Sequence, residues 1–230
     1  MASCARRPVS HKTTPPIMDI DLYFYLIAAG VIAGLIRDRR LRPPVLRLFV
    51  PFLILTLLME VLGMVLSRKH IVNHWIFNFF TCGEFLFYSY IYSRLLVDKK
   101  WKRVIRYAMV LYPVVFLVNV FFVEGFYRFH TISYRVGSVM IVFWCYLYLR
   151  QLMRSEATEP IFRIPAFWIS TGLLFFYTGF FFYMSAGYIL LYTNVIIDKV
   201  IWYAISGTLN AILYGCFLIA FICQGLWKKK

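Results

Sequence analysis

Apolar runs of about 20 residues alternate with short polar turns along the chain. A run of this length matches the hydrocarbon core of a bilayer, about 30 Å thick, when it forms a helix that rises about 1.5 Å per residue. The clearest runs are the last two, because no Asp, Glu, Lys or Arg occurs from Ile164 to Ile197 or from Val200 to Trp227. The pattern predicts seven transmembrane helices, close to residues 20–36, 45–66, 75–96, 104–123, 131–149, 165–187 and 200–226.

The composition agrees with a membrane protein. The chain is 62% hydrophobic and 20% aromatic, and only 15% of its residues are charged, which lies far outside the usage of soluble domains. The loops are short, so consecutive helices are expected to be antiparallel neighbours. We therefore expect an all-α membrane protein in which residues 19–230 form a single seven-helix transmembrane domain. Residues 1–18 lack the apolar core of a signal peptide and are expected to be disordered, or to precede a true start at Met18.

The basic residues predict the orientation of this bundle. Of the 25 Lys and Arg residues, 17 fall on the side that holds the C-terminus. Because Lys and Arg accumulate in cytoplasmic loops, the N-terminus is expected outside and the C-terminus in the cytoplasm. The expected location is the cell membrane, specifically a bacterial inner membrane, as a multi-pass protein. The basic clusters adjoin apolar spans, so the net charge of +15 favours the lipid bilayer and its anionic headgroups as partner and not nucleic acid.

Polar residues inside the predicted spans are the candidates for function, because an ionisable group in hydrocarbon costs several kcal/mol unless it faces protein or water. Glu60 and Glu84 both fall in the outer half of the membrane when helices are counted from their ends. Uncharged polar residues reach comparable depths, namely Asn78, Asn119, Ser138, Thr178 and Asn210. Together they predict an outward-facing pocket that binds a ligand or handles protons. The alternative is that they only form hydrogen bonds between helices.

Histidines provide a weaker candidate site. His70 and His74 are four residues apart, and with His130 they would supply three ligands for zinc, as in a membrane hydrolase that acts on lipids. The last helix, however, contains no histidine, and the chain lacks GxSxG, HExxH, CxxC and glycine-rich phosphate-binding motifs. The sequence therefore favours a protein that is not an enzyme, and no cofactor is expected.

Four segments carry a resemblance to known sequences. They are LFVPFLILTLLMEVLG, NHWIFNFFTCGEFLFYSYIYSRLL, PAFWISTGLLFFYTGFFF and LNAILYGCFLIAFIC. From about residue 20 onward the chain resembles short, uncharacterised bacterial seven-helix membrane proteins, some of them similar to the membrane input regions of sensor histidine kinases. The resemblance implies a sensor-like module with Glu60, Asn78 and Glu84 at recurring polar positions, and a separate signalling protein as its partner.

Three hypotheses for the function follow. A sensor or receptor-like module would bind a ligand at the outward pocket and would pass a signal through its basic cytoplasmic face. A small-solute transporter would alternate access to the same pocket, with Glu84 or Glu60 coupling protons. A zinc-dependent lipid hydrolase would need the metal at the three histidines. The sensor hypothesis is the one that the sequence favours.

Overall fold

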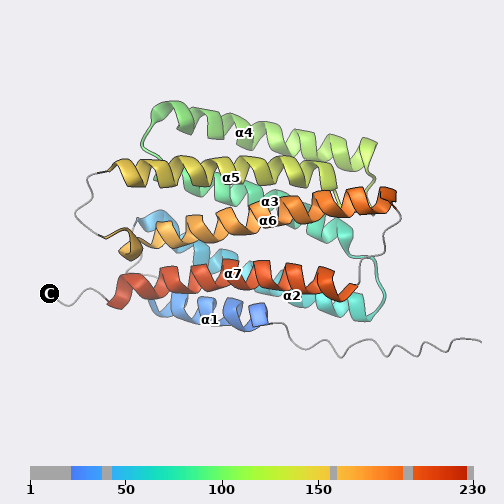
Figure 1. The fold of residues 1–230 in the computed structure, drawn as a ribbon, viewed down its shortest axis with the longest axis horizontal. Helices are drawn as coiled ribbons and strands as arrows, with labels where there is room; N and C mark the ends of the chain where they lie inside the picture. The colour runs from blue at the N-terminus through green and yellow to red at the C-terminus, as the bar shows by residue number, and fades with distance from the viewer. Residues whose placement is uncertain (1–21, 38–42, 156–159, 194–198, 227–230) are drawn as a thin grey trace, which may run out of the picture.

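The computed structural model describes residues 22–37, 43–155, 160–193 and 199–226, so the predicted N-terminal tail, residues 1–18, lies outside the described residues. The described chain is helical throughout its regular elements, and consecutive helices run in opposite directions (Figure 1). The helices are α1 (Leu22–Arg37), η2 (Pro44–Leu48), α2 (Phe49–Arg68), α3 (His74–Leu95), α4 (Lys99–Val118), η3 (Asn119–Val123), α5 (Thr131–Arg154), η4 (Ile161–Arg163), α6 (Pro165–Thr193) and α7 (Lys199–Leu226).

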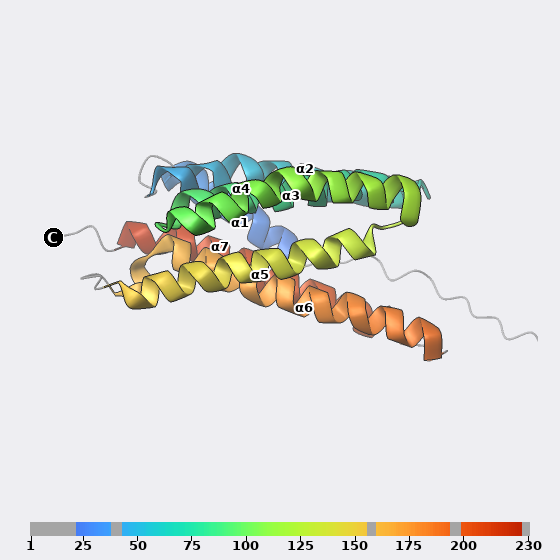
Figure 2. The same ribbon diagram turned by 90° about the horizontal axis from the view of Figure 1, so that it is seen from above.

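Six of the helices form a closed ring. The packed pairs α3/α5, α5/α6, α6/α7, α7/α1 and α1/α2 follow one another around it. Aromatic contacts between α2 and α3 close the ring, for example the stacked rings of Phe52 and Phe87, whose centroids are 4.0 Å apart. α4 lies outside the ring against α3, at the edge of the bundle in Figure 1, and a second view along another axis is given in Figure 2.

Five helical segments are long and apolar enough to cross a membrane: Pro44–Arg68, Lys99–Val123, Thr131–Arg154, Pro165–Ala186 and Ala204–Cys223. The chain is therefore a helical membrane protein. Two predicted spans differ from these five in the described part of the chain. α1 is apolar but shorter, and α3 carries more polar side chains, among them Asn78 and Glu84. α3 contacts α4, α5 and α2, and this protein environment explains how it accommodates a more polar sequence.

Several predicted helix boundaries need correction. The predicted helix at 104–123 begins at Lys99 and ends in a short π-helix, the one at 131–149 continues to Arg154, and the one at 165–187 continues to Thr193. The predicted helix at 45–66 begins one residue earlier as the 3-10 turn η2 and continues to Arg68. The predicted bounds followed the apolar runs, whereas at α2, α4 and α5 the helix also includes Lys or Arg residues, which are good helix formers and whose side chains extend to the headgroups. The extension of α6 to Thr193 lies within the uncharged run itself.

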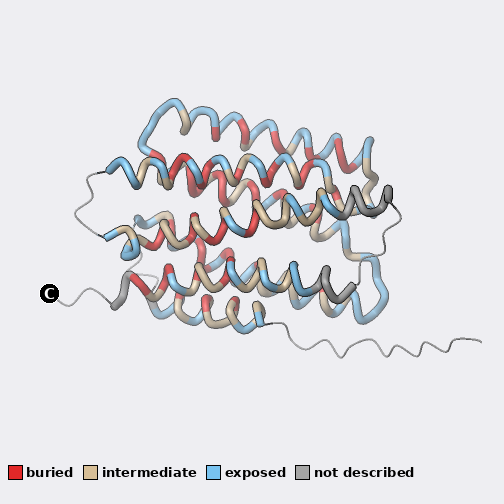
Figure 3. Tube along the Cα trace, viewed as in Figure 1, coloured by how far each residue is buried: buried red, intermediate tan, exposed pale blue. Residues whose placement is uncertain are grey.

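One end of the bundle carries most of the described basic side chains. This basic end, defined by Arg47, Arg94, Lys99, Arg154 and Arg163, is where α3, α5 and α7 end and where α4 and α6 begin. Buried residues are concentrated in the half of the bundle nearer to it, and the far parts of α6 and α7 are more exposed (Figure 3). The described side chains of 178–186 and 204–212 include no buried one. In the described parts of α6 and α7, burial therefore decreases toward the opposite end.

Candidate functional site

Glu60 on α2 and Glu84 on α3 are brought together near the middle of the bundle. The hydroxyl of Tyr23 donates to Oε2 of Glu60 at 3.4 Å, and the hydroxyl of Tyr88 donates to Oε1 of Glu84 at 3.2 Å. The two carboxylates are close enough for their charges to interact. The fold thus places two acidic side chains from neighbouring helices in one group.

Three more tyrosines surround this pair. Tyr177 on α6 hydrogen-bonds the Glu84 side chain, Tyr134 on α5 lies within electrostatic range of Glu84, and Tyr214 on α7 lies within range of both carboxylates. The rings are also near one another, with centroid distances of 6.1 Å for Tyr88 and Tyr177 and 6.3 Å for Tyr134 and Tyr177. The carboxylate–tyrosine cluster consists of Tyr23, Glu60, Glu84, Tyr88, Tyr134, Tyr177 and Tyr214. Each of the six ring helices contributes at least one member.

Helical spacing explains why these side chains meet. Glu60 is four residues after the buried Thr56 and three before the buried Gly63, so it lies on the inward face of α2. Glu84 is four residues before Tyr88 on the inward face of α3. At about 1.5 Å per residue, the carboxylates lie roughly 12–15 Å from the ends of α2 and α3 that are opposite the basic end. This is near the middle of α3.

Glu60 and Glu84 are less buried than four of the five tyrosines in the cluster. Tyr88, Tyr134, Tyr177 and Tyr214 are buried, each with at most 6% of its surface exposed, whereas Glu60 and Glu84 are only half-buried. The cluster therefore combines two carboxyl groups, several hydroxyls and the faces of aromatic rings, which are groups that can take part in ligand binding.

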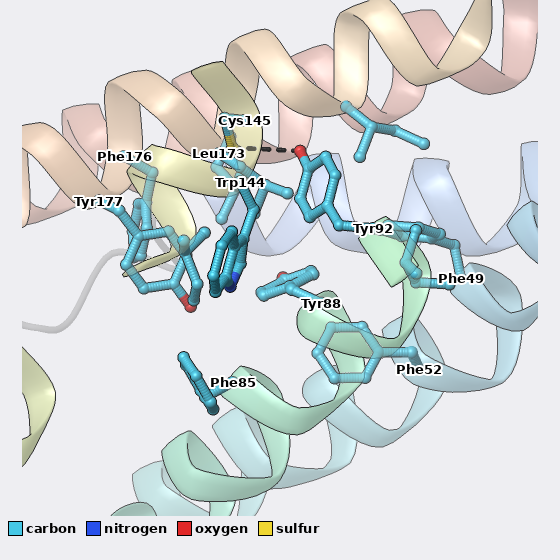
Figure 4. Packing of buried hydrophobic residues seen from close by; sticks show 14 of the residues in the cluster. Phe49, Phe52, Phe85, Tyr88, Tyr92, Trp144, Cys145, Leu173, Phe176 and Tyr177 are labelled. Carbon is cyan, nitrogen blue, oxygen red and sulfur yellow. Dashed lines mark hydrogen bonds between the residues drawn. The ribbon is translucent and has the colours of Figure 1, made fainter. Parts of the chain in front are cut away.

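Trp144 carries a buried donor that the described residues leave without a partner. Trp144 on α5 is only 3% exposed, and its indole Nε1 has no hydrogen-bond partner among the described residues. In the view of Figure 4 the indole is drawn between Tyr177 and Tyr88, among the buried aromatic side chains of the core. An indole N–H usually finds a partner when it is buried. This one remains available to a hydrogen-bond acceptor.

Asn78, which the sequence predicts in a ligand pocket, bonds the backbone of a turn in the structure. It is completely buried, its Nδ2 donates to the carbonyl of Arg128 at 2.7 Å, and its Oδ1 accepts from the backbone N–H of His130 at 3.2 Å. Asn78 thus fastens the turn between η3 and α5 to α3. This turn contains Gly125, whose φ of 90° lies in the left-handed region that favours glycine.

The other predicted polar residues form local hydrogen bonds. Nδ2 of Asn119 donates to Glu124 at 2.5 Å, the hydroxyl of Ser138 donates to the carbonyl of Tyr134 at 2.8 Å, and Nδ2 of Asn210 donates to the carbonyl of Ser206 at 3.0 Å. Asn210 is four residues before Tyr214 and so shares its face of α7. Thr178 is half-buried on α6, next to Tyr177.

The three candidate metal ligands do not form a metal site in the structure. His70 and His74 are exposed, whereas His130 is completely buried with Nε2 at 2.6 Å from the hydroxyl of Thr81. In the described part of the chain, no three His, Cys, Asp or Glu side chains come close enough to hold a metal ion. The zinc ligands predicted from the spacing are therefore not brought together, because His130 faces the bundle through Thr81 on α3.

His130 gives the protein an expected sensitivity to acid. Burial lowers the pKa of His130 from 6.5 to about 4. Among the described residues, no acceptor lies at hydrogen-bond distance from Nδ1, the ring nitrogen that would be protonated in acid. The unfolded chain then binds more protons between these two pKa values, so stability is full above about pH 6.5 and is lost as the pH falls toward 4. We expect the free energy of unfolding to drop by about 2 kcal/mol between pH 7 and pH 5.

Thermal unfolding of the purified protein at a series of pH values measures this effect. The His130→Gln variant serves as the reference, because glutamine can still donate to Thr81 but does not titrate. The wild-type protein should lose more stability on acidification than the variant does. Parallel curves for both proteins would show that His130 is not responsible.

The sequence identified both carboxylates of the cluster but missed its tyrosines and Trp144. Tryptophan and tyrosine are enriched at the headgroup level of membrane proteins, so these residue types alone do not indicate a site inside the bundle. A usable signal was present in the spacing, because Tyr88 follows Glu84 by four residues and therefore must lie on the same face of its helix. Tyr134, Tyr177 and Tyr214 carry no such local signal, since their proximity to Glu84 depends on the packing of α5, α6 and α7 against α3.

Comparison with known proteins adds no relative to this description: no protein-family model, no curated protein and no solved structure matches the chain.

Proposed function

We propose that the chain is a seven-span sensor-like membrane module that binds a ligand at the carboxylate–tyrosine cluster. The observation that carries the proposal is the meeting of Glu60 and Glu84 in a group to which six helices contribute. A ligand held between six helices makes contacts that depend on their relative positions. Its binding can therefore favour one arrangement of the bundle over another, which is what a receptor requires.

The proposed orientation has the basic end in the cytoplasm. The excess of Lys and Arg at that end supports it through the positive-inside rule. α1 and α3 are proposed to span the membrane with the five more apolar segments, because α3 packs antiparallel to its neighbours along the bundle and the described part of α1 is apolar and packs against α7 and α2. In this orientation the cluster lies roughly 12–15 Å from the outer ends of α2 and α3. The basic end is the surface on which a separate signalling protein would dock, next to anionic headgroups.

A screen for ligands tests the proposal. The purified protein in lipid nanodiscs is heated with small cationic, neutral and anionic solutes, and a ligand is recognised by a saturable increase in the melting temperature. A ligand at about 100 times its dissociation constant stabilises the folded state by about 2.7 kcal/mol. The increase should disappear in the Glu84→Gln variant, which retains the size of the side chain and an acceptor for Tyr88.

Uptake into vesicles distinguishes the sensor from the alternative, a proton-coupled transporter. The stabilising solute is supplied in labelled form to vesicles that contain the protein, with and without a pH gradient. A sensor binds about one equivalent per site and accumulates nothing inside. Accumulation driven by the gradient and lost in Glu84→Gln would favour the transporter, and stabilisation that survives in this variant would contradict the proposed site.

A further inference from the structure

We propose that α4 binds an anionic phospholipid of the bilayer. The headgroup lies at basic side chains in the first two turns of the helix, and an acyl chain follows the exposed apolar side chains beyond them. This lipid site goes beyond the proposed function, because it is on the outer surface of the bundle and does not depend on a ligand at the carboxylate–tyrosine cluster. Its basis is the order of side chains along α4 and the place of α4 outside the ring.

Four basic side chains share one side of α4. They are Lys99, Lys102, Arg103 and Arg106, and together they form the basic stripe. Their positions are i, i+3, i+4 and i+7, the spacing that brings side chains onto one face of a helix. Three of them are exposed and Lys102 is half-buried. The basic stripe extends over about 10 Å of the helix axis, comparable with the headgroup layer on one side of a bilayer, roughly 5–8 Å.

Apolar side chains continue this stripe toward the middle of the membrane. Val110, Val114 and Leu117 follow Arg106 at intervals of three or four residues and form the apolar part of the stripe; they are 72%, 54% and 42% exposed. A different side of α4, which includes the buried Ile105, packs on the bundle. From Arg106 to Leu117 the helix rises about 16 Å, close to half of a hydrocarbon core of about 30 Å. The cationic and apolar parts thus match the length of one phospholipid in one leaflet.

The basic stripe has no counter-charge within its helix. No Asp or Glu occurs at positions 99–123, and the four side chains form no ion pair among the described residues. Asp98 precedes them as the N-cap and accepts from the backbone N–H of Lys100 at 2.7 Å. Like charges four residues apart, such as Lys102 and Arg106, destabilise a helix, and so do cations near its N-terminus. An anionic headgroup at the basic stripe offsets both effects.

A bilayer lipid fits this surface better than a soluble acidic protein does. α4 lies against α3 outside the ring, and the segment Lys99–Val123 is long and apolar enough to cross a membrane. Much of the helix is exposed along its length (Figure 3). A soluble partner would contact the basic stripe and leave the apolar part in hydrocarbon, whereas a phospholipid contacts both. Trp101, whose ring centroid lies 5.4 Å from that of Phe143 on α5, is at the same level as the basic stripe, and tryptophan is enriched at headgroup depth.

Native mass spectrometry of the full chain tests the lipid site. The protein in detergent is titrated with phosphatidylglycerol, which has a net negative charge, or with phosphatidylcholine of the same acyl chains, which has none. The fraction of protein that carries a lipid gives the affinity. We expect phosphatidylglycerol to bind about tenfold more tightly, because several basic side chains attract its phosphate.

Two double variants assign this difference to the basic stripe. Arg103→Gln combined with Arg106→Gln should weaken the binding of phosphatidylglycerol about tenfold and leave phosphatidylcholine unchanged. Arg68→Gln combined with Lys69→Gln is the matched control, because these side chains are exposed at the opposite end of α2 and the loss of charge is the same. The control should keep the wild-type affinity. Glutamine is a good helix former, so neither change removes a helix.

A photoactivatable phosphatidylglycerol locates the lipid on the wild-type protein. With the reactive group in the acyl chain, the labelled residues should fall within 107–118, beside the apolar part of the stripe. This measurement needs no variant and reports the position of the lipid directly.

Four results would overturn the lipid site. Equal weakening in the two double variants would show that only total charge matters, and labelling spread evenly over the exposed helices would show that no position is preferred. Glycerophosphoglycerol that stabilises the protein in phosphatidylcholine nanodiscs as well as phosphatidylglycerol does would assign the basic stripe to a soluble anion. A dimer that retains no lipid would assign α4 to contact between copies of the chain. The ligand screen at Glu84 is unaffected by any of these results.

Discussion

Replacing Asn78 with leucine should lower the free energy of unfolding by about 3 kcal/mol or more, because the change removes the partners of two backbone groups, one of them at the completely buried His130. Those groups are the carbonyl of Arg128 and the N–H of His130, which the Asn78 side chain bonds at 2.7 and 3.2 Å. Each unsatisfied group costs about 1–3 kcal/mol. The apolar leucine cannot replace either bond, although it suits the interior of the bundle.

Thermal unfolding of the two proteins in the same detergent measures the difference, and limited proteolysis reports whether the turn at 124–130 has come loose. Asn210→Leu is the matched control, because Asn210 bonds only the carbonyl of Ser206 in its own helix. We expect this control to change stability by less than about 1 kcal/mol. Equal losses in both variants would mean that asparagines in these helices contribute through something other than the turn.

Replacing Gly172 with valine should be at least as damaging, because α6 and α7 touch backbone to backbone at this glycine. A Cβ atom built on Gly172 would lie 2.8 Å from Cβ of Cys216 and 3.3 Å from the carbonyl oxygen of Leu213. Neither atom belongs to the flexible end of a side chain, so the two helices would have to separate. Small residues allow such close approaches between membrane helices, and overpacking them typically costs about 1–3 kcal/mol for each added group.

A graded series measures this cost. Gly172→Ala should be destabilised by about 1–2 kcal/mol, and Gly172→Val by about 3 kcal/mol or more. Gly215→Ala on α7 is the control, because a Cβ there meets no atom within 4 Å. Alanine should be tolerated at Gly215 or slightly stabilising through its higher helix propensity. A Gly172 series no different from this control would contradict the close crossing of α6 and α7.

The two glutamates show how a functional hypothesis can begin with one sequence. Glu60 and Glu84 were singled out because carboxylates inside apolar runs are costly, and this argument needs no knowledge of their neighbours. The same argument also included Asn78, Asn119 and Ser138 among the candidates. Their hydrogen bonds are local or fasten a turn, and no feature of the sequence separates such a role from a place in a binding site.

The helices follow from local patterns along the chain, whereas their arrangement follows from contacts between distant residues. The apolar runs predicted a helical chain, the positions of its helices to within about six residues and a membrane protein, because these depend on local periodicity and on transfer from water to hydrocarbon. The ring of helices, the exclusion of α4 from it and the tyrosines around Glu84 depend on which faces pack together. That choice is made by contacts between residues far apart in the chain, such as Glu84 with Tyr177, and no local pattern encodes them.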